Sequence, residues 1–211
     1  MPAAQVQNDS QAYIIIGLPA SGKSGIAKDI ADMCGAVILD SDFAKRKLPE
    51  FKATPAGASL VHDESDLIIF GTYDRDDKPA AFESLFDLCL KAAANIVIPK
   101  IGYDSNKLLS FSKSLKENYN YDVHLILVSL DRRQATIRAL NRFQRTKRYV
   151  PLSLIFDGYG NDPILTYYRL KTSRAKSRIF RSLGKLSTDV PKGSRPVLID
   201  HKGSSPALIY A

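Results

Sequence analysis

The chain has 211 residues, a net charge of +8 and a hydrophobic content of 45%. These values predict one globular α/β domain. They exclude a membrane-spanning helix, because no apolar run approaches the roughly 18 residues that a span needs. The two cysteines, Cys34 and Cys89, lie in helical patterns, which predicts reduced core thiols and a cytoplasmic protein. Residues 1–12 are polar and small, so we expect a disordered tail rather than a signal peptide.

In the first half of the chain, short apolar runs alternate with helical patterns. We predict strands at 14–16 and 36–39, helices at 24–33, 58–70 and 79–94, a short basic helix or turn at 43–48, and loops at 50–57 and 71–78. The acidic residues of the 58–70 helix are expected on its outer side. Pro79 is expected at the first helical position of the next helix, whose core stripe would include Phe82 and Phe86.

The second half continues the alternation. We predict strands at 96–98, 123–130 and 196–200, and helices at 104–118, 132–144, 151–156 and 162–170. Fully apolar strands separated by helices are typical of a parallel sheet that is covered on both faces and connected by right-handed crossovers. Residues 171–195 have no clear pattern, and we predict only a basic C-terminal segment there.

A phosphate-binding motif lies between the first predicted strand and the first predicted helix. The residues Gly17-Leu18-Pro19-Ala20-Ser21-Gly22-Lys23-Ser24 fit the pattern G-x-x-x-x-G-K-[ST], and Gly25 follows. In such a loop the backbone N–H groups and the helix N-terminus bind phosphate oxygens. Lys23 would reach the β- and γ-phosphates, and the Ser24 hydroxyl would ligate Mg²⁺. The motif predicts a nucleoside triphosphate, ATP or GTP, as ligand, with Mg²⁺ as cofactor.

The motif and the alternation together predict an α/β fold of the P-loop NTPase class, nucleoside-kinase-like. We expect a three-layer sandwich with a parallel, doubly wound sheet of about five strands. Residues 13–211 would form a single kinase domain.

Two further groups of charged residues are candidates for the same site. Asp40-Ser41-Asp42 follows the second strand, at the edge of the sheet where ligands bind. Asp42 is a candidate general base or magnesium ligand, and a helix cap is the alternative. Arg138, Arg142 and Arg145 share one face of the helix at 132–144 and could stabilise transferring phosphate, or could form a solvated face. The third strand ends without an Asp, which favours a small-molecule kinase over a mechanical ATPase.

These residues resemble the zeta toxin family of P-loop kinases, over roughly residues 13–151. Those kinases phosphorylate UDP-N-acetylglucosamine and related UDP-sugars and are the toxin halves of toxin–antitoxin pairs. The resemblance implies that Asp42 is the base that activates the sugar hydroxyl and that Arg142 and Arg148 clamp the phosphates. It also implies that Glu83, twelve residues before Asn95, binds substrate.

After the third strand the family usually has Glu-Gly-Thr and a nearby Arg. This chain has Pro99-Lys100-Ile101-Gly102-Tyr103, and Lys100 would replace the arginine charge. The substrate-side residues implied are therefore Glu83, Asp40 and Lys100. An antitoxin is the partner that the resemblance implies.

The residues leave other acceptors and another class of protein open. The acceptor could be a nucleoside, an antibiotic or a polynucleotide end. Residues 131–195 carry 16 Lys or Arg and four Asp, so the chain could instead be a nucleotide-dependent module that binds nucleic acid. A solvated basic face is an equally good interpretation of the part beyond Arg169.

Overall fold

A computed structural model describes residues 5–53, 57–71, 82–146, 150, 153–156, 163–171, 176–181 and 197–200. Its centre is a six-stranded sheet in the order β2-β3-β1-β4-β5-β6. The strands are β1 Gln11–Ile16, β2 Val37–Ile38, β3 Ile96–Lys100, β4 Asp122–Ser129, β5 Lys176–Arg181 and β6 Val197–Asp200. The first five are parallel to one another, and β6 is antiparallel to β5.

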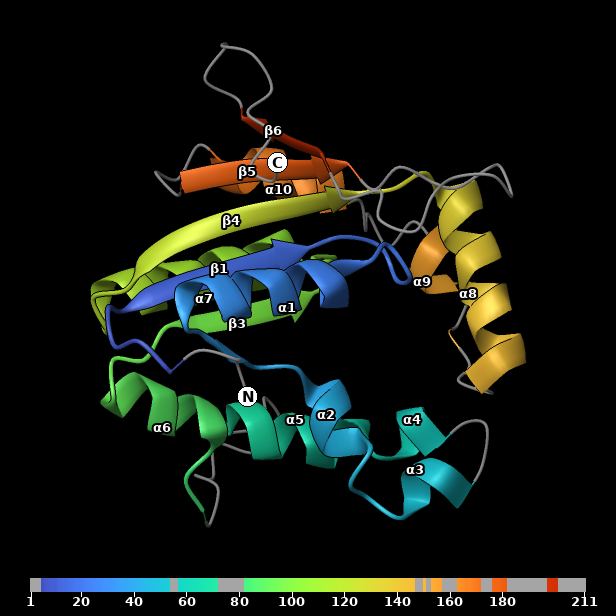
Figure 1. The fold of residues 1–211 in the computed structure, drawn as a ribbon, viewed down its shortest axis with the longest axis horizontal. Coiled ribbons are helices and arrows are strands. Elements are labelled where there is room, and N and C mark those ends of the chain that lie inside the picture. Colours follow the sequence, from blue (N-terminus) through green and yellow to red (C-terminus); the bar gives the residue numbers. More distant parts are fainter. Residues whose placement is uncertain are drawn as a thin grey trace.

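Ten helices occur among the described residues and surround this sheet (Figure 1). They are α1 Lys23–Cys34, α2 Ser41–Lys45, α3 Glu50–Ala53, α4 Gly57–Leu60, α5 His62–Phe70, α6 Leu85–Lys91, α7 Ser105–Glu117, α8 Arg132–Thr146, α9 Ser153–Phe156 and α10 Pro163–Lys171. None of the helices in the described part of the chain has both the length and the apolar character that crossing a membrane requires.

The sheet is buried on both faces, which gives three layers. On one face, Ile26 and Ile30 of α1 pack against Ile15 and Val97. On the other face, residues of α5, α6, α7 and α10 pack against alternate residues of the same strands, among them Ile14 and Ile98. This double burial explains why the central parts of β1, β3 and β4 are continuous apolar runs instead of alternating with polar residues. The predicted α/β P-loop fold is confirmed.

The strand count differs from the prediction at the C-terminal end. The structure adds β5, which pairs with β4 from His124↔Lys176 to Ser129↔Arg181, in a segment where no strand was predicted. Its sequence, Lys-Ser-Arg-Ile-Phe-Arg, has three basic residues, so it lacks the apolar signature of the other parallel strands. The strand predicted at 196–200 is present as β6.

The helix predicted from Pro79 begins later. α6 starts at Leu85, and Ser84 is its N-cap. The Ser84 hydroxyl accepts a hydrogen bond from the Asp87 N–H, and the Asp87 carboxylate accepts one from the Ser84 N–H. This capping box defines the start of the helix. Phe82 therefore precedes the helix and is exposed instead of joining the core stripe. Pro79 itself lies outside the described residues.

The helix predicted at 58–70 also differs, because it is divided into α4 and α5. The preceding loop contains α3. Not all acidic residues of α5 face outward, since Asp66 contacts Ser41.

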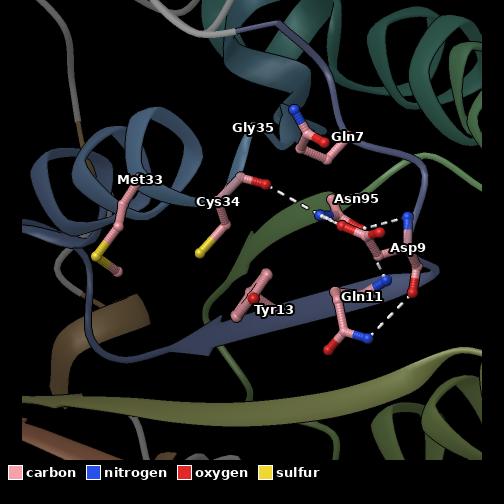
Figure 2. A pocket seen from close by; sticks show the side chains of 8 residues that line it. All are labelled: Gln7, Asp9, Gln11, Tyr13, Met33, Cys34, Gly35 and Asn95. Carbon is pink, nitrogen blue, oxygen red and sulfur yellow. Dashed lines mark hydrogen bonds between the residues drawn. The ribbon is translucent and has the colours of Figure 1, made fainter.

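The amino-terminal edge of the sheet is closed by Asn95. The Asn95 side-chain carbonyl accepts hydrogen bonds from the N–H groups of Asp9 and Gln11, and its amide donates to the Cys34 carbonyl at 2.9 Å (Figure 2). Residues 5–10, expected in the tail, are tied to the sheet here, because Gln7 exchanges backbone hydrogen bonds with Gly35 and Asn95. The residues around Asn95 line an open pocket of about 370 Å³.

Candidate functional site

The phosphate loop connects β1 to α1 at the opposite, carboxyl-terminal edge of the sheet. A Cβ atom at Gly17 would lie 2.5 Å from the backbone oxygen of Val128, so the loop passes too close to β4 for any side chain. Gly22, the N-cap of α1, has φ 101°, a conformation that favours glycine. Gly17 and Gly22, the two fixed glycines of the motif, are therefore required for different steric reasons.

The N-terminus of α1 is suited to binding an anion. Gly22 provides no side-chain cap, and the first turn of α1 has no acidic residue. The first N–H groups of the helix and its partial positive charge thus face the loop without a competing carboxylate. The Ser21 hydroxyl is buried and has no hydrogen-bond partner among the described residues. A phosphate oxygen is the kind of acceptor that this loop lacks.

Lys23 is folded back over the loop. Its ammonium group donates hydrogen bonds to the carbonyl oxygens of Gly17 at 2.7 Å and Leu18 at 2.8 Å. Burial lowers the pKa of Lys23 to about 8, the charges of Asp40 and Asp42 oppose this shift, and that of Arg142 adds to it. The lysine of the motif therefore lies within electrostatic reach of the residues predicted to share its site.

The helix α2 presents Asp42 at this edge. Asp40 is the N-cap of α2, because its carboxylate accepts a hydrogen bond from the Asp42 N–H at 3.0 Å. The capping role that was one interpretation of Asp42 thus belongs to Asp40. The Asp42 carboxylate lies 3.8 Å from the ammonium group of Lys45, a buried lysine on the same helix.

Arg142 lies on α8, which packs against the loop. The buried side chains of Ala135 and Ala139 on α8 form one cluster with Leu18 of the loop and Ile155 of α9. Figure 1 shows α8 and α9 beyond the carboxyl ends of β1 and β4. Small alanines permit a close approach, and Arg142 follows them on the same face one turn later.

The other arginines of the prediction are placed differently. Arg145 is exposed, and its side chain donates to the Asn141 carbonyl of its own helix. Arg138 is half-buried. Arg148 lies outside the described residues.

Lys100 ends β3 beside the phosphate loop. Its ammonium group lies 3.7 Å from the centre of the Phe70 ring, and Ile101 next to it accepts a hydrogen bond from the Gly17 N–H. Burial lowers the pKa of Lys100, the charges of Asp66 and then Asp40 oppose that shift, and Lys45 adds to it. The charge of Asp40 thus acts on Lys100, and both are predicted substrate-side residues.

Glu83 is not part of this group in the structure. It precedes α6, is exposed, and forms an ion pair with Lys91. That arrangement is typical of a surface carboxylate.

Two residues of this edge were not predicted, Asp66 and Lys45. The sequence signal for Asp66 is the spacing of His62, Asp66 and Phe70, which places all three on one face of α5. Asp63 and Glu64 precede Asp66 in the sequence, and all acidic residues of this helix were expected on the outer side. Lys45 lies in a run of basic residues, where nothing distinguishes a buried lysine from an exposed one.

A magnesium ion would fit here only together with a nucleotide. The Ser24 hydroxyl is in the first turn of α1 and is exposed. In the part of the chain that the structure describes, no three His, Cys, Asp or Glu side chains are grouped to hold a metal. Phosphate oxygens would have to complete the coordination of the ion.

The sequence model of the zeta toxin family matches residues 3–161, three quarters of the chain. The chain belongs to the zeta toxin family. The resemblance inferred from the motifs is therefore confirmed. No curated protein sequence matches the chain significantly.

Solved structures show the same fold at low identity. A chain from the PezAT chromosomal toxin–antitoxin system of Streptococcus pneumoniae has a TM-score of 0.60 and 16% identity, covering 85% of this chain and 69% of that one. A putative kinase from Chloroflexus aurantiacus has a TM-score of 0.53 and 14% identity, covering 72% and 77%. The AvrRxo1-ORF1:ORF2 complex solved with ATP has a TM-score of 0.56 and 17% identity, covering 85% of this chain and 55% of that one.

Proposed function

We propose that this zeta toxin family member is an ATP-dependent kinase that phosphorylates a hydroxyl group of a small anionic acceptor, with a UDP-sugar as the first candidate. The observation that carries the proposal is that Lys23, hydrogen-bonded to the phosphate loop, interacts electrostatically with Asp40, Asp42 and Arg142. A lysine, an arginine and a carboxylate beside such a loop are the parts that phosphoryl transfer needs.

In this proposal Asp42 acts as the general base. It takes the proton of the acceptor hydroxyl as the new oxygen–phosphorus bond forms on the γ-phosphorus and the bond to the β,γ-bridging oxygen breaks, which releases ADP. Lys23 and Arg142 stabilise the negative charge on the transferring group. Arg148 is proposed for the same role. Mg²⁺ bound to Ser24 would supply further positive charge at the phosphates.

The acceptor side is proposed at Lys100 and Asp40. A half-buried lysine beside the ring of Phe70 can bind an anionic group, and carboxylates can accept hydrogen bonds from hydroxyls. Glu83 remains a candidate from the family resemblance alone. GTP is the alternative donor.

The test is transfer of the labelled γ-phosphate of ATP to a panel of UDP-sugars, nucleosides and 5′-hydroxyl oligonucleotides. We expect one acceptor class to become labelled by the wild-type chain. Asp42→Asn should lower kcat by about 10²–10⁴-fold with little change in the Kd of ATP. Asp29→Asn, an exposed carboxylate on α1, is the matched control and should behave as wild type. Equal activity of Asp42→Asn and wild type would exclude Asp42 as the base.

An antitoxin protein is the proposed partner. The support is the family membership and the description of the Streptococcus pneumoniae relative as part of a toxin–antitoxin system. Inhibition of the labelled transfer by the product of an adjacent gene would test this proposal, and full activity of the complex would contradict an inhibitory partner.

A further inference from the structure

The helix α2 is too short to hold its own orientation. It has five residues, and Asp40 caps its N-terminus. Isolated helices of this length are unstable, because nucleation fixes several residues before hydrogen bonds compensate for the lost entropy. The direction in which Asp42 points must therefore be fixed by contacts from other elements.

One contact joins α2 directly to α5. Ser41 is buried, and its hydroxyl donates a hydrogen bond to Asp66. The second carboxylate oxygen of Asp66 lies 3.9 Å from Nε2 of His62, one turn earlier on α5. Ser41 immediately precedes Asp42, so the contact lies one residue from the proposed base.

The same carboxylate acts on Lys100. Phe70, one turn after Asp66 on α5, has the Lys100 ammonium over its ring at 3.7 Å. Asp66 and Phe70 therefore face Lys100 from one side of α5. Asp66 makes the largest favourable charge interaction that opposes deprotonation of Lys100.

We propose that Asp66 is a positioning residue, which fixes α2 and Asp42 through the Ser41 hydroxyl and holds Lys100 at the acceptor side through its charge. This inference rests on the proposed kinase function for its effect on turnover. It names α5 as the element that aligns the base with the acceptor site.

Three variants separate the two effects. Ser41→Ala removes the hydrogen bond and keeps the charge. Asp66→Asn removes the charge and keeps an oxygen that can accept from Ser41. Asp66→Ala removes both. Glu64→Gln, an exposed carboxylate on the same helix, is the matched control.

In the transfer of labelled phosphate to the acceptor, Ser41→Ala should lower kcat about tenfold. The KM of ATP and the KM of the acceptor should both stay within about twofold of the wild-type values. Asp66→Asn should raise the KM of the acceptor about fivefold to tenfold and leave the KM of ATP unchanged. The double variant Ser41→Ala/Asp66→Ala should have the same kcat as Asp66→Ala, because both substitutions break the same hydrogen bond. Wild-type kinetics in Ser41→Ala and Asp66→Ala would overturn the inference.

Two measurements need no acceptor and separate this inference from the proposed function. Amide hydrogen exchange of α2 should accelerate in Ser41→Ala and Asp66→Ala and stay unchanged in Glu64→Gln. The pH dependence of chemical labelling at Lys100 should shift to lower pH in Asp66→Asn. If the wild-type chain labels no acceptor, the kinase proposal fails, and these two readouts still decide whether Asp66 fixes α2 and Lys100. If the amide exchange of α2 and the chemical labelling of Lys100 are unchanged in these variants, the inference is overturned.

Discussion

The pH dependence of nucleotide binding provides a direct test of Lys23. Its pKa in the nucleotide-free structure is about 8 because the ammonium is buried. A phosphate ligand needs the charged form, so a deprotonated Lys23 must take up a proton when the nucleotide binds. Affinity should therefore be highest well below pH 8 and should fall as the pH rises through 8.

The expected magnitude follows from the fraction of Lys23 that is protonated. With a pKa of about 8, this fraction falls from about three quarters at pH 7.5 to about 3% at pH 9.5. The Kd of ATP should therefore rise about 25-fold over this range, equivalent to about 1.9 kcal/mol, if the bound phosphates keep Lys23 charged. The phosphates themselves are fully ionised throughout, since their second pKa is about 6.

Calorimetric titration with ATP at five pH values, in buffers of different ionisation enthalpy, measures both the Kd and the proton uptake. The Lys23→Met variant should bind weakly at every pH, without this dependence. The Lys28→Met variant, which lacks an exposed lysine of the same helix, should keep the wild-type dependence. A Kd in the wild type that changes less than threefold between pH 7.5 and 9.5 would refute the reasoning.

Two further predictions concern steric fit and buried polarity. Gly17→Ala should weaken ATP binding more than tenfold, since its Cβ would meet a backbone oxygen at 2.5 Å, whereas Gly25→Ala, with nothing within 4 Å, should bind normally. A normal Kd for Gly17→Ala would show that the loop can shift. Asn95→Ala should lower the free energy of unfolding by about 2–3 kcal/mol in urea titration, because the buried Asn95 side chain makes hydrogen bonds to three backbone groups that the variant would lose. The exposed Asn118→Ala control should change it by less than about 0.5 kcal/mol.

The phosphate loop and the central strands could be predicted from the sequence because each depends on local residues. Gly17, Gly22 and Lys23 have fixed spacing in a short loop, and β1 and β3 are apolar at positions that face both layers. The strand β5 could not be predicted in this way. Its residues pair with β4 across more than forty positions of the chain, and their basic composition gives no local signal.

The charged residues of the site were only partly predictable for a related reason. Asp40 and Asp42 follow a strand, so their place at the carboxyl edge follows from the direction of that strand. Asp66 lies in a helix whose other carboxylates are exposed, and only the position of α5 beside α2 shows that it faces inward. The role of Glu83 is implied by the family resemblance, and it stays a prediction; the structure places Glu83 before the helix, because the capping box begins at Ser84.

Three locally unfavourable features lie at the phosphate loop. Ala20 has φ 61°, which a residue with a Cβ atom adopts at a cost of about 1–2 kcal/mol. The Ser21 hydroxyl is buried without a hydrogen bond, and Lys23 is buried with a charge. A nucleotide would supply phosphate oxygens for the unpaired hydroxyl and negative charge for the lysine, so these costs are the kind that ligand binding offsets.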